Sequence, residues 1–327
     1  MKKLINAVDA VLWESLQGLE AIHGNILALG DGGAFVRRKT LKPGKVALIS
    51  GGGSGHEPLH AGFVGLGMLD AACPGQVFTS PTPDQMLAAV AAVDSGAGSL
   101  FVVKNYEGDV MNFEMAAEMA ETAVATVVID DDVAVPASTW STGRRGVAGT
   151  LIVEKMVGAA AEQGRELSAL KTLGEDINRR TRSMGVALSS CTVPAAGKPT
   201  FTLAEDEMEM GVGIHGEPGR RRVKLASADA ISDEMMGAIL GDLSLAGATP
   251  CLLLVNGFGS TPAMELYLMA HAAKRALAAH GLVMARGLVG SYVTSLDMAG
   301  CSLTVTALDD GLIELWDAPV HTAALRW

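Results

Sequence analysis

Short apolar runs alternate along the chain with longer segments that have helical patterns of apolar positions. The short runs are rich in Val, Ile and Leu and are bounded by turn residues, which is typical of β-strands. They lie at 45–50, 99–106, 125–135, 185–191, 251–259 and 301–316. The helical patterns lie at 82–95, 112–123, 146–164, 166–184 and 261–281. This alternation predicts an α/β protein with largely parallel or mixed central sheets flanked by helices.

The details of this pattern suggest where the chain divides. A long predicted helix ends at Met184, and a strand and a segment rich in Pro and Gly follow it. The length of 327 residues also favours two domains. We therefore predict an N-terminal α/β domain at 1–184 and a C-terminal α/β domain at 185–327. In the last predicted strand segment, two alternating runs flank Leu308-Asp309-Asp310-Gly311, which predicts a β-hairpin.

Composition and charge exclude several classes of function. The formal net charge of -11 argues against a nucleic-acid partner, because binding phosphates requires a basic face. No window approaches the roughly 18 apolar residues that a membrane span needs, so we expect no membrane partner and a cytoplasmic protein. The cysteines lie far apart without CxxC spacing, which argues against a zinc or redox site and leads us to expect no metal.

The stretch KVALISGGGSGHEPLH, residues 45–60, leads a predicted strand that ends at Ser50 into a run of glycines and then His56. Glycines adopt backbone angles closed to other residues and let a ligand approach the main chain. If a helix begins just after them, its N-terminus favours an anionic or oxygen-rich ligand. The patterns GxxxxGK[ST] and GxGxxG both fail here. A phosphate cradle, a catalytic site and a plain turn stay open, although His56 argues against a plain turn.

A second polar constellation follows the predicted strand that ends at Lys104. Asp109 comes five residues later. Because the carboxyl ends of parallel strands meet at the edge where α/β sheets bind ligands, we expect Lys104 and Asp109 beside His56. Taken alone, Asp109 is better explained as a turn residue or as the cap of a helix that starts near Asn112.

A third constellation is GVGIHGEPG, in which His215 lies between Gly213 and Gly216 and is followed by Glu217. His56 also precedes a glutamate, and such carboxylates could orient each ring and fix its tautomer. No HxH, HxxxH or HExxH spacing supports a metal site. The other histidines lack such a context, and we interpret them as surface or core residues: His23, His60, His271, His280 and His321.

Segments in order along the chain, among them GKVALISGGGSGHEPLHAGFVGLGML, VVKNYEGDVMNFE, EMEMGVGIHGEPG and NGFGSTPAMELY, closely resemble the dihydroxyacetone kinase family, specifically its ketose-binding K subunit. The resemblance spans essentially the whole chain. It implies a homodimer of two-domain α/β subunits in which His215 adds to the ketose carbonyl as a covalent hemiaminal. It implies that His56 and Asp109 bind and activate the hydroxyl, with Gly53 and Lys104 as further substrate contacts.

The resemblance also implies a partner. In the family, ATP or ADP sits on a separate all-helical L unit, for which this chain has no room. We therefore expect that this chain binds no cofactor and that nucleotide and Mg are held by an L-type partner, which a phosphotransferase-system protein could recharge. The connection at 241–250 is short where some phosphotransferase-linked members carry an insertion, so the phosphoryl donor stays open.

Three functions are compatible with these features. The chain could be a kinase subunit for dihydroxyacetone or a four-carbon ketose such as erythrulose, a regulatory paralogue that senses the ketose without turnover, or a nucleotide-binding α/β protein. The joint presence of His56, Asp109 and His215 favours the kinase subunit, because sensing needs the carbonyl trap but not the base.

Overall fold

The computed structural model describes residues 2–135, 141–217, 219–245 and 247–327, which fall into two compact units. We call residues 2–129, 150–176 and 314–327 the glycine-loop unit. We call residues 130–149 and 177–313 the His215 unit. The predicted division into 1–184 and 185–327 differs from these units, because the chain passes from one to the other four times rather than once.

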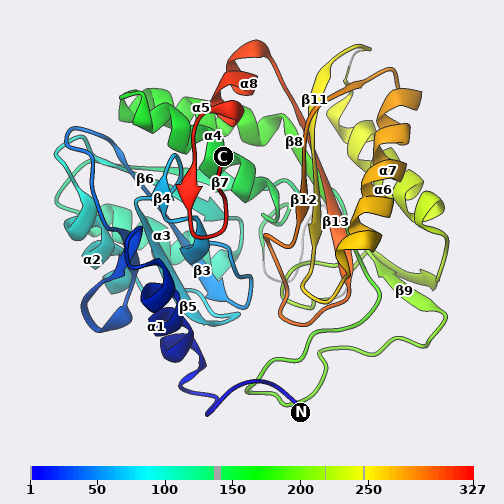
Figure 1. Cartoon of the computed structure of the whole chain (residues 1–327), viewed down its shortest axis with the longest axis horizontal. Coiled ribbons are helices and arrows are strands. Elements are labelled where there is room, and N and C mark those ends of the chain that lie inside the picture. Colours follow the sequence, from blue (N-terminus) through cyan, green and yellow to red (C-terminus); the bar gives the residue numbers. More distant parts are fainter. Residues whose placement is uncertain (1, 136–140, 218, 246) are drawn as a thin grey trace. The chain divides into compact units, whose positions relative to one another are not determined.

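The glycine-loop unit contains a mixed sheet with the strand order β1-β2-β5-β3-β6-β7 (Figure 1). β5, β3, β6 and β7 run parallel, and β1 and β2 add an antiparallel edge. The strand bounds are β1 Leu27–Leu29, β2 Val36–Arg38, β3 Ala47–Ser54, β5 Ala71–Val77, β6 Ser99–Lys104 and β7 Val124–Ile129. A small pair is formed by β4 Gly65–Leu66 and β14 His321–Thr322.

Helices cover both faces of this sheet. Apolar residues of α2 and α3 pack on alternate strand positions that include Ile49, Phe101 and Val103. The intervening positions point the other way, and from there Ser50 reaches a hydrogen-bonded group that includes Glu154 of α4. The helix bounds are α1 Val11–His23, α2 Pro83–Val93, α3 Glu107–Met119, α4 Gly149–Glu162 and α5 Leu167–Arg179.

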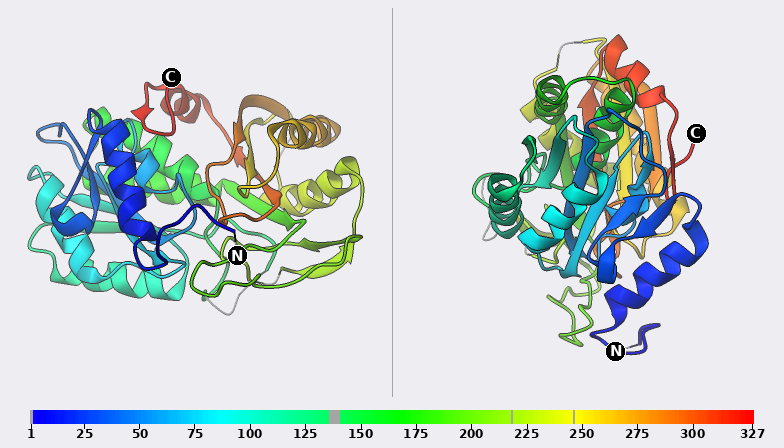
Figure 2. Two further views of the ribbon diagram at one scale, coloured as in Figure 1. Left: turned by 60° about the horizontal axis from the view of Figure 1, so that its bottom comes forward. Right: turned by 90° about the vertical axis from the view of Figure 1, so that its left-hand side faces the viewer.

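The His215 unit is built on a second mixed sheet with the order β10-β9-β8-β13-β11-β12. β11 and β12 are parallel, and the other neighbouring pairs are antiparallel. α6 and α7 lie side by side and bury their apolar residues against one face of this sheet (Figure 2). The bounds are β8 Thr181–Ala187, β9 Glu207–Met210, β10 Arg221–Lys224, α6 Ala228–Leu243, β11 Pro250–Gly257, α7 Ala263–Ala279, β12 Val283–Gly290 and β13 Gly300–Ala307.

The predicted fold class, α/β with mixed sheets flanked by helices, is confirmed. The predicted hairpin at 301–316 is wrong, because β13 is followed by the helix α8, Asp310–Asp317. Asp309 explains the difference, since its Oδ1 accepts a hydrogen bond from the N–H of Leu312 at 2.9 Å and so caps the helix. The predicted helix at 166–184 also runs too far: α5 ends at Arg179 and β8 begins at Thr181, where it pairs with β13.

The glycine-rich stretch also differs from its prediction. β3 does not end at Ser50 but continues to Ser54, because Gly51, Gly52 and Gly53 pair in parallel register with β5. The segment after it forms a short 3₁₀ turn, Ala61–Phe63, where the sequence left room for an α-helix. In the described part of the chain, no helix combines the length and apolar character needed to cross a bilayer.

Two helix glycines provide a test of this packing. A Cβ at Gly158 of α4 would lie 2.6 Å from Gly67 O and Met68 Cα, whereas a Cβ at Gly237 of α6 would meet no atom within 4 Å. We expect Gly158→Ala to lower the free energy of unfolding by roughly 1–3 kcal/mol. We expect Gly237→Ala to raise it by about 0.5–1 kcal/mol, because alanine is the better helix former. Calorimetry of both variants would contradict this packing if Gly158→Ala were as stable as Gly237→Ala.

Candidate functional site

The glycines of β3 allow two groups to approach the main chain closely. A Cβ at Gly53 would lie 2.6 Å from Thr79 N and 2.8 Å from Phe78 Cα. A Cβ at Gly52 would collide with the amine of Lys104. Side chains are therefore excluded here by the loop on one side and by a buried amine on the other, which is a stronger requirement than a turn imposes.

His56 follows directly and is fully buried. Its ring stacks on Phe78 with centroids 5.1 Å apart and planes 19° from parallel. Phe78 itself has φ +56°, a conformation that costs energy for a residue with a side chain. Its N–H donates to Ser54 O at 2.9 Å, which helps to hold this loop against β3. The imidazole therefore sits against a neighbour whose own backbone is tightly constrained.

Lys104 and Asp109 meet at the carboxyl end of β6. Lys104 is the last residue of β6, and Asp109 lies in the first turn of α3, which begins at Glu107 rather than near Asn112. Lys104 Nζ lies 3.8 Å from Asp109 Oδ2, and it donates to Gly51 O at 3.4 Å. Asp109 Oδ1 is buried and has no hydrogen-bond partner among the residues that the structure describes. A buried carboxylate oxygen without a partner is rare and can accept a proton or hydrogen bond from a ligand.

His60, interpreted above as an ordinary surface or core residue, belongs to the same group. Its Nε2 lies 2.8 Å from Lys104 Nζ, and its Nδ1 lies 2.6 Å from Glu154 Oε1 and 2.9 Å from Ser50 Oγ. We call Ser50, His60, Lys104, Asp109 and Glu154 the buried polar cluster. Glu154 is 94 residues from His60 in sequence, so no local spacing could have revealed this pairing.

Burial shifts the ionisation of the cluster. It raises the pKa of Glu154 to about 8, although the nearby Ser50 hydroxyl and the charge of Lys104 oppose the shift. Burial and then the charges of Lys104 and His56 lower the pKa of His60 well below its ordinary value. Burial also lowers the pKa of Lys104, although Asp109 and Glu154 oppose the shift. The environment therefore keeps His60 neutral and favours a proton on Glu154 at neutral pH.

His215 lies in the other unit, in the loop after β9. The main-chain N–H of His215 donates to Glu217 Oε2 at 2.7 Å, and the ring Nδ1 lies 3.9 Å from Glu217 Oε1. Glu217 is itself held by Arg145, whose Nη1 lies 3.5 Å away and whose Nε donates to Asp132 at 2.8 Å. Arg145 also donates to Gly211 O at 2.7 Å. The carboxylate thus lies on the Nδ1 side of the imidazole.

Glu217 has a lowered pKa because of its neighbours His215 and Arg145. Burial alone would raise the pKa of Glu217, but the interaction with His215 and the charge of Arg145 lower it to about 2. Glu217 therefore stays ionised at neutral pH. An ionised carboxylate beside Nδ1 favours the tautomer that carries its proton there.

The sequence-predicted residues thus fall into two sets. Gly53, His56, Lys104 and Asp109 lie at the carboxyl ends of β3 and β6 in the glycine-loop unit, and His215 lies in the His215 unit. Among the residues that the structure describes, no group of three or more His, Cys, Asp or Glu side chains could hold a metal ion.

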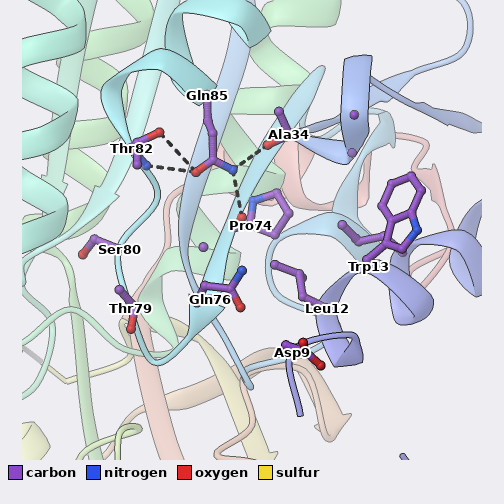
Figure 3. A pocket seen from close by; sticks show the side chains of 14 residues that line it. Asp9, Leu12, Trp13, Ala34, Pro74, Gln76, Thr79, Ser80, Thr82 and Gln85 are labelled. Carbon is purple, nitrogen blue, oxygen red and sulfur yellow. Dashed lines mark hydrogen bonds between the residues drawn. The ribbon is translucent and has the colours of Figure 1, made fainter. Parts of the chain in front are cut away.

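A separate cavity of about 430 Å³ lies beside α1 and the segment between β5 and α2 (Figure 3). Trp13, Gln76 and Thr79 are among the residues that line it. Gln85 closes one wall, where its amide donates to Ala34 O and Pro74 O at 2.8 and 3.1 Å. None of the predicted site residues lines this cavity, so it is distinct from the predicted site.

Substitution of Glu217 by Gln tests the electrostatics of the His215 loop. The folded-state pKa of about 2 lies below the ordinary 4.5, so ionised Glu217 stabilises the fold above pH 4.5, and this stabilisation is lost as the pH falls towards 2. We expect Glu217→Gln to cost roughly 2–3 kcal/mol of unfolding free energy at pH 7 and clearly less at pH 3.5. Urea unfolding at both pH values measures this, with the exposed Glu205→Gln as control. A cost that does not change with pH would contradict the assignment.

Sequence and structure comparisons with known proteins identify the same family. The Dak1 domain model matches residues 17–324. The chain is 48% identical over 354 aligned residues to the "PEP-dependent dihydroxyacetone kinase, dihydroxyacetone-binding subunit DhaK" of Escherichia coli, covering 100% of this chain and 99% of that protein.

Two solved structures share the fold. The "dihydroxyacetone kinase operon co-activator Dha-DhaQ" superposes with a TM-score of 0.90 at 35% identity, covering 95% of this chain and 97% of that one. The dihydroxyacetone kinase of C. freundii in complex with AMP-PNP and Mg²⁺ superposes with a TM-score of 0.88 at 34% identity, covering 98% of this chain and 60% of that one. Together with the match over nearly its whole length, these likenesses show that the chain belongs to the Dak1 domain family.

Proposed function

We propose that this chain is the dihydroxyacetone-binding subunit of a dihydroxyacetone kinase. The E. coli relative, which matches over the full length of both chains, has this function by name. The observation that carries the proposal is Asp109, whose buried Oδ1 has no hydrogen-bond partner among the described residues and whose Oδ2 lies 3.8 Å from Lys104 Nζ. This arrangement suits a ligand hydroxyl that must lose its proton.

In this proposal the glycine-loop unit handles the hydroxyl end of the ketose. Asp109 acts as the general base for the hydroxyl to be phosphorylated, a role worth roughly 10² to 10⁴ in rate. Lys104 stabilises the negative charge that develops on the hydroxyl oxygen. His56 contributes a further hydrogen bond, and the bare main chain at Gly53 lets a small polyol lie close.

The His215 unit traps the carbonyl. The lone pair on His215 Nε2 forms a bond to the ketone carbon, and the π electrons of the carbonyl move to its oxygen, which takes up a proton. The ring loses its Nδ1 proton to water while the new alkoxide oxygen gains one from water, so the hemiaminal is neutral and Glu217 stays ionised. Glycerol has no carbonyl and is excluded by this chemistry, whereas pocket shape alone separates such similar molecules only about a hundredfold or less.

The phosphoryl group comes from a partner in this proposal. The C. freundii kinase was solved with AMP-PNP and Mg²⁺, and this chain matches only 60% of it, which supports a nucleotide site on a separate L-type subunit. The E. coli relative is PEP-dependent by name, which favours recharging of that nucleotide by a phosphotransferase-system protein over exchange with free ATP. We also propose a homodimer of this chain, as the family resemblance implies.

A regulatory role is the second candidate, because one structural relative is named as an operon co-activator. A sensor that does not turn over its ligand needs the carbonyl trap but has no use for a base. The Asp109 oxygen that lacks a hydrogen-bond partner among the described residues therefore favours the kinase subunit. Among kinase substrates, a four-carbon ketose such as erythrulose is the alternative to dihydroxyacetone, and a ketose panel assayed with an L-type partner separates the two.

The hemiaminal can be observed directly. Carbon-13 NMR of dihydroxyacetone labelled at the ketone carbon should show conversion to a tetrahedral carbon when the purified chain is added. His215→Ala should abolish this conversion, because it removes the nucleophile, and the exposed His280→Ala of the same unit should retain it. If the bound ketose kept its ketone signal in the wild-type chain, His215 would have no covalent role.

The role of Asp109 is tested by turnover. With an L-type partner supplied, Asp109→Ala should lower kcat by roughly 10² to 10⁴ while the carbon-13 adduct still forms, since the base acts after the ketose is bound. Glu107→Ala is the matched control, because Glu107 lies in the same first turn of α3 but is exposed. Undiminished turnover of Asp109→Ala would remove Asp109 from the mechanism.

A further inference from the structure

The amine of Lys104 lies at the centre of three acceptors from three parts of the glycine-loop unit. Its Nζ is 2.8 Å from His60 Nε2, 3.4 Å from Gly51 O and 3.8 Å from Asp109 Oδ2. The side chain is fully buried, so water does not compete for these contacts. A lysine has a flexible stem and is not held in one place by its own geometry. Its position therefore depends on these acceptors.

The proton positions on His60 follow from its neighbours. An ammonium group only donates, so Nε2 must accept from Lys104 and the single proton of the neutral ring lies on Nδ1. Two acceptors face Nδ1. Glu154 Oε1 is 2.6 Å away, and Ser50 Oγ is 2.9 Å away and uses its own proton to donate to Val102 O at 2.6 Å. Every hydrogen bond around the ring then has one donor and one acceptor.

We propose that His60 is a positioning residue for Lys104, fixed by Ser50 and Glu154 through Nδ1 and holding the ammonium group beside Asp109 through Nε2. This inference rests on the proposed function, in which Lys104 and Asp109 act on the ketose hydroxyl. It adds His60, with Ser50 and Glu154 behind it, to the residues on which the reaction depends.

The imidazole does something here that a carboxylate could not. A carboxylate in contact with Lys104 would form a second ion pair and compete with Asp109 for the ammonium charge. His60 instead offers a neutral acceptor and keeps Glu154 one ring away from the amine. The raised pKa of Glu154, about 8 because of burial, supports this, since a Glu154 protonated on Oε2 still accepts from Nδ1 at Oε1 and leaves Asp109 to balance the charge of Lys104. The charge of the Lys104 amine is thus balanced by Asp109, the residue proposed to act on the ketose hydroxyl.

Two substitutions of His60 test the inference. His60→Leu removes the acceptor, and turnover with an L-type partner should fall about 10- to 100-fold, the range expected when a reacting group is misplaced by about 1 Å. His60→Gln restores an acceptor oxygen near the position of Nε2 and should recover most of this loss. Turnover is divided by the number of sites that form the carbon-13 adduct, so a poorly folded fraction does not enter the result.

Lys155→Met is the matched control. Lys155 is also buried, is the neighbour of Glu154 on α4, and donates instead to Leu315 O at 2.8 Å. We expect this variant to lose stability but to keep turnover per adduct-forming site. The inference is overturned if His60→Leu turns over at the wild-type rate per site, or if His60→Gln is as impaired as His60→Leu. Absence of the adduct in the wild-type chain would instead refute the proposed function.

Nitrogen-15 NMR of the histidine-labelled chain tests the geometry without any ketose. Between pH 6 and 8, His60 should show a protonated Nδ1 and an unprotonated Nε2, as set by Lys104 of β6, Glu154 of α4, and His56 and Asp109 nearby. Lys104→Met should remove the hydrogen bond and shift the Nε2 resonance. A proton on Nε2, or an imidazolium at pH 6, would overturn the inference even if the kinase activity is confirmed.

Discussion

The positive charge buried at the end of β6 is the constraint on which the glycine-loop unit depends. An ammonium group removed from water is tolerated only where acceptors surround it. Those around Lys104 come from β3, from the segment after it and from α3. Gly52 of β3 follows from the same requirement, because a side chain there would occupy the place of the amine. The buried amine of Lys104 therefore requires a residue without a side chain at position 52.

Each unit pairs a histidine with a glutamate, and the two pairs differ in charge. Burial raises the pKa of Glu154 to about 8, whereas the pKa of Glu217 is lowered to about 2 although burial opposes this. The difference lies in the partners of each carboxylate, because the interaction with His215 and then the charge of Arg145 lower the pKa of Glu217. Arg145 lies 3.5 Å from Glu217, while the ring of His60 separates Glu154 from Lys104. An ionised carboxylate suits the nucleophilic role proposed for His215, and a neutral one suits the positioning role proposed for His60.

The sequence predicted those parts of the fold and site that depend on local patterns. Apolar runs identify strands because burial repeats along them, and Lys104 and Asp109 could be placed because the carboxyl ends of parallel strands share an edge. Local patterns failed where pairing at a distance decides. β3 continues through its glycines because β5 pairs with them. His60 belongs to the buried polar cluster because it contacts Glu154, which is distant in sequence. The error at α8 has another cause, since the segment Asp309-Asp310-Gly311 suits the start of a helix capped by Asp309 as well as a hairpin turn.

The extension of β3 also decides between two interpretations of the glycine stretch. A phosphate cradle requires main-chain N–H groups at the free start of a helix, but Gly51–Gly53 are paired with β5 and a 3₁₀ turn of three residues follows. The nearby groups that can act on a ligand are instead side chains, with Lys104 as cation and Asp109 as acceptor. This combination suits a hydroxyl better than a phosphate, because Asp109 would repel an anion that Lys104 attracts. The strand edge therefore fits our proposal that it binds the acceptor of the phosphoryl group rather than its donor.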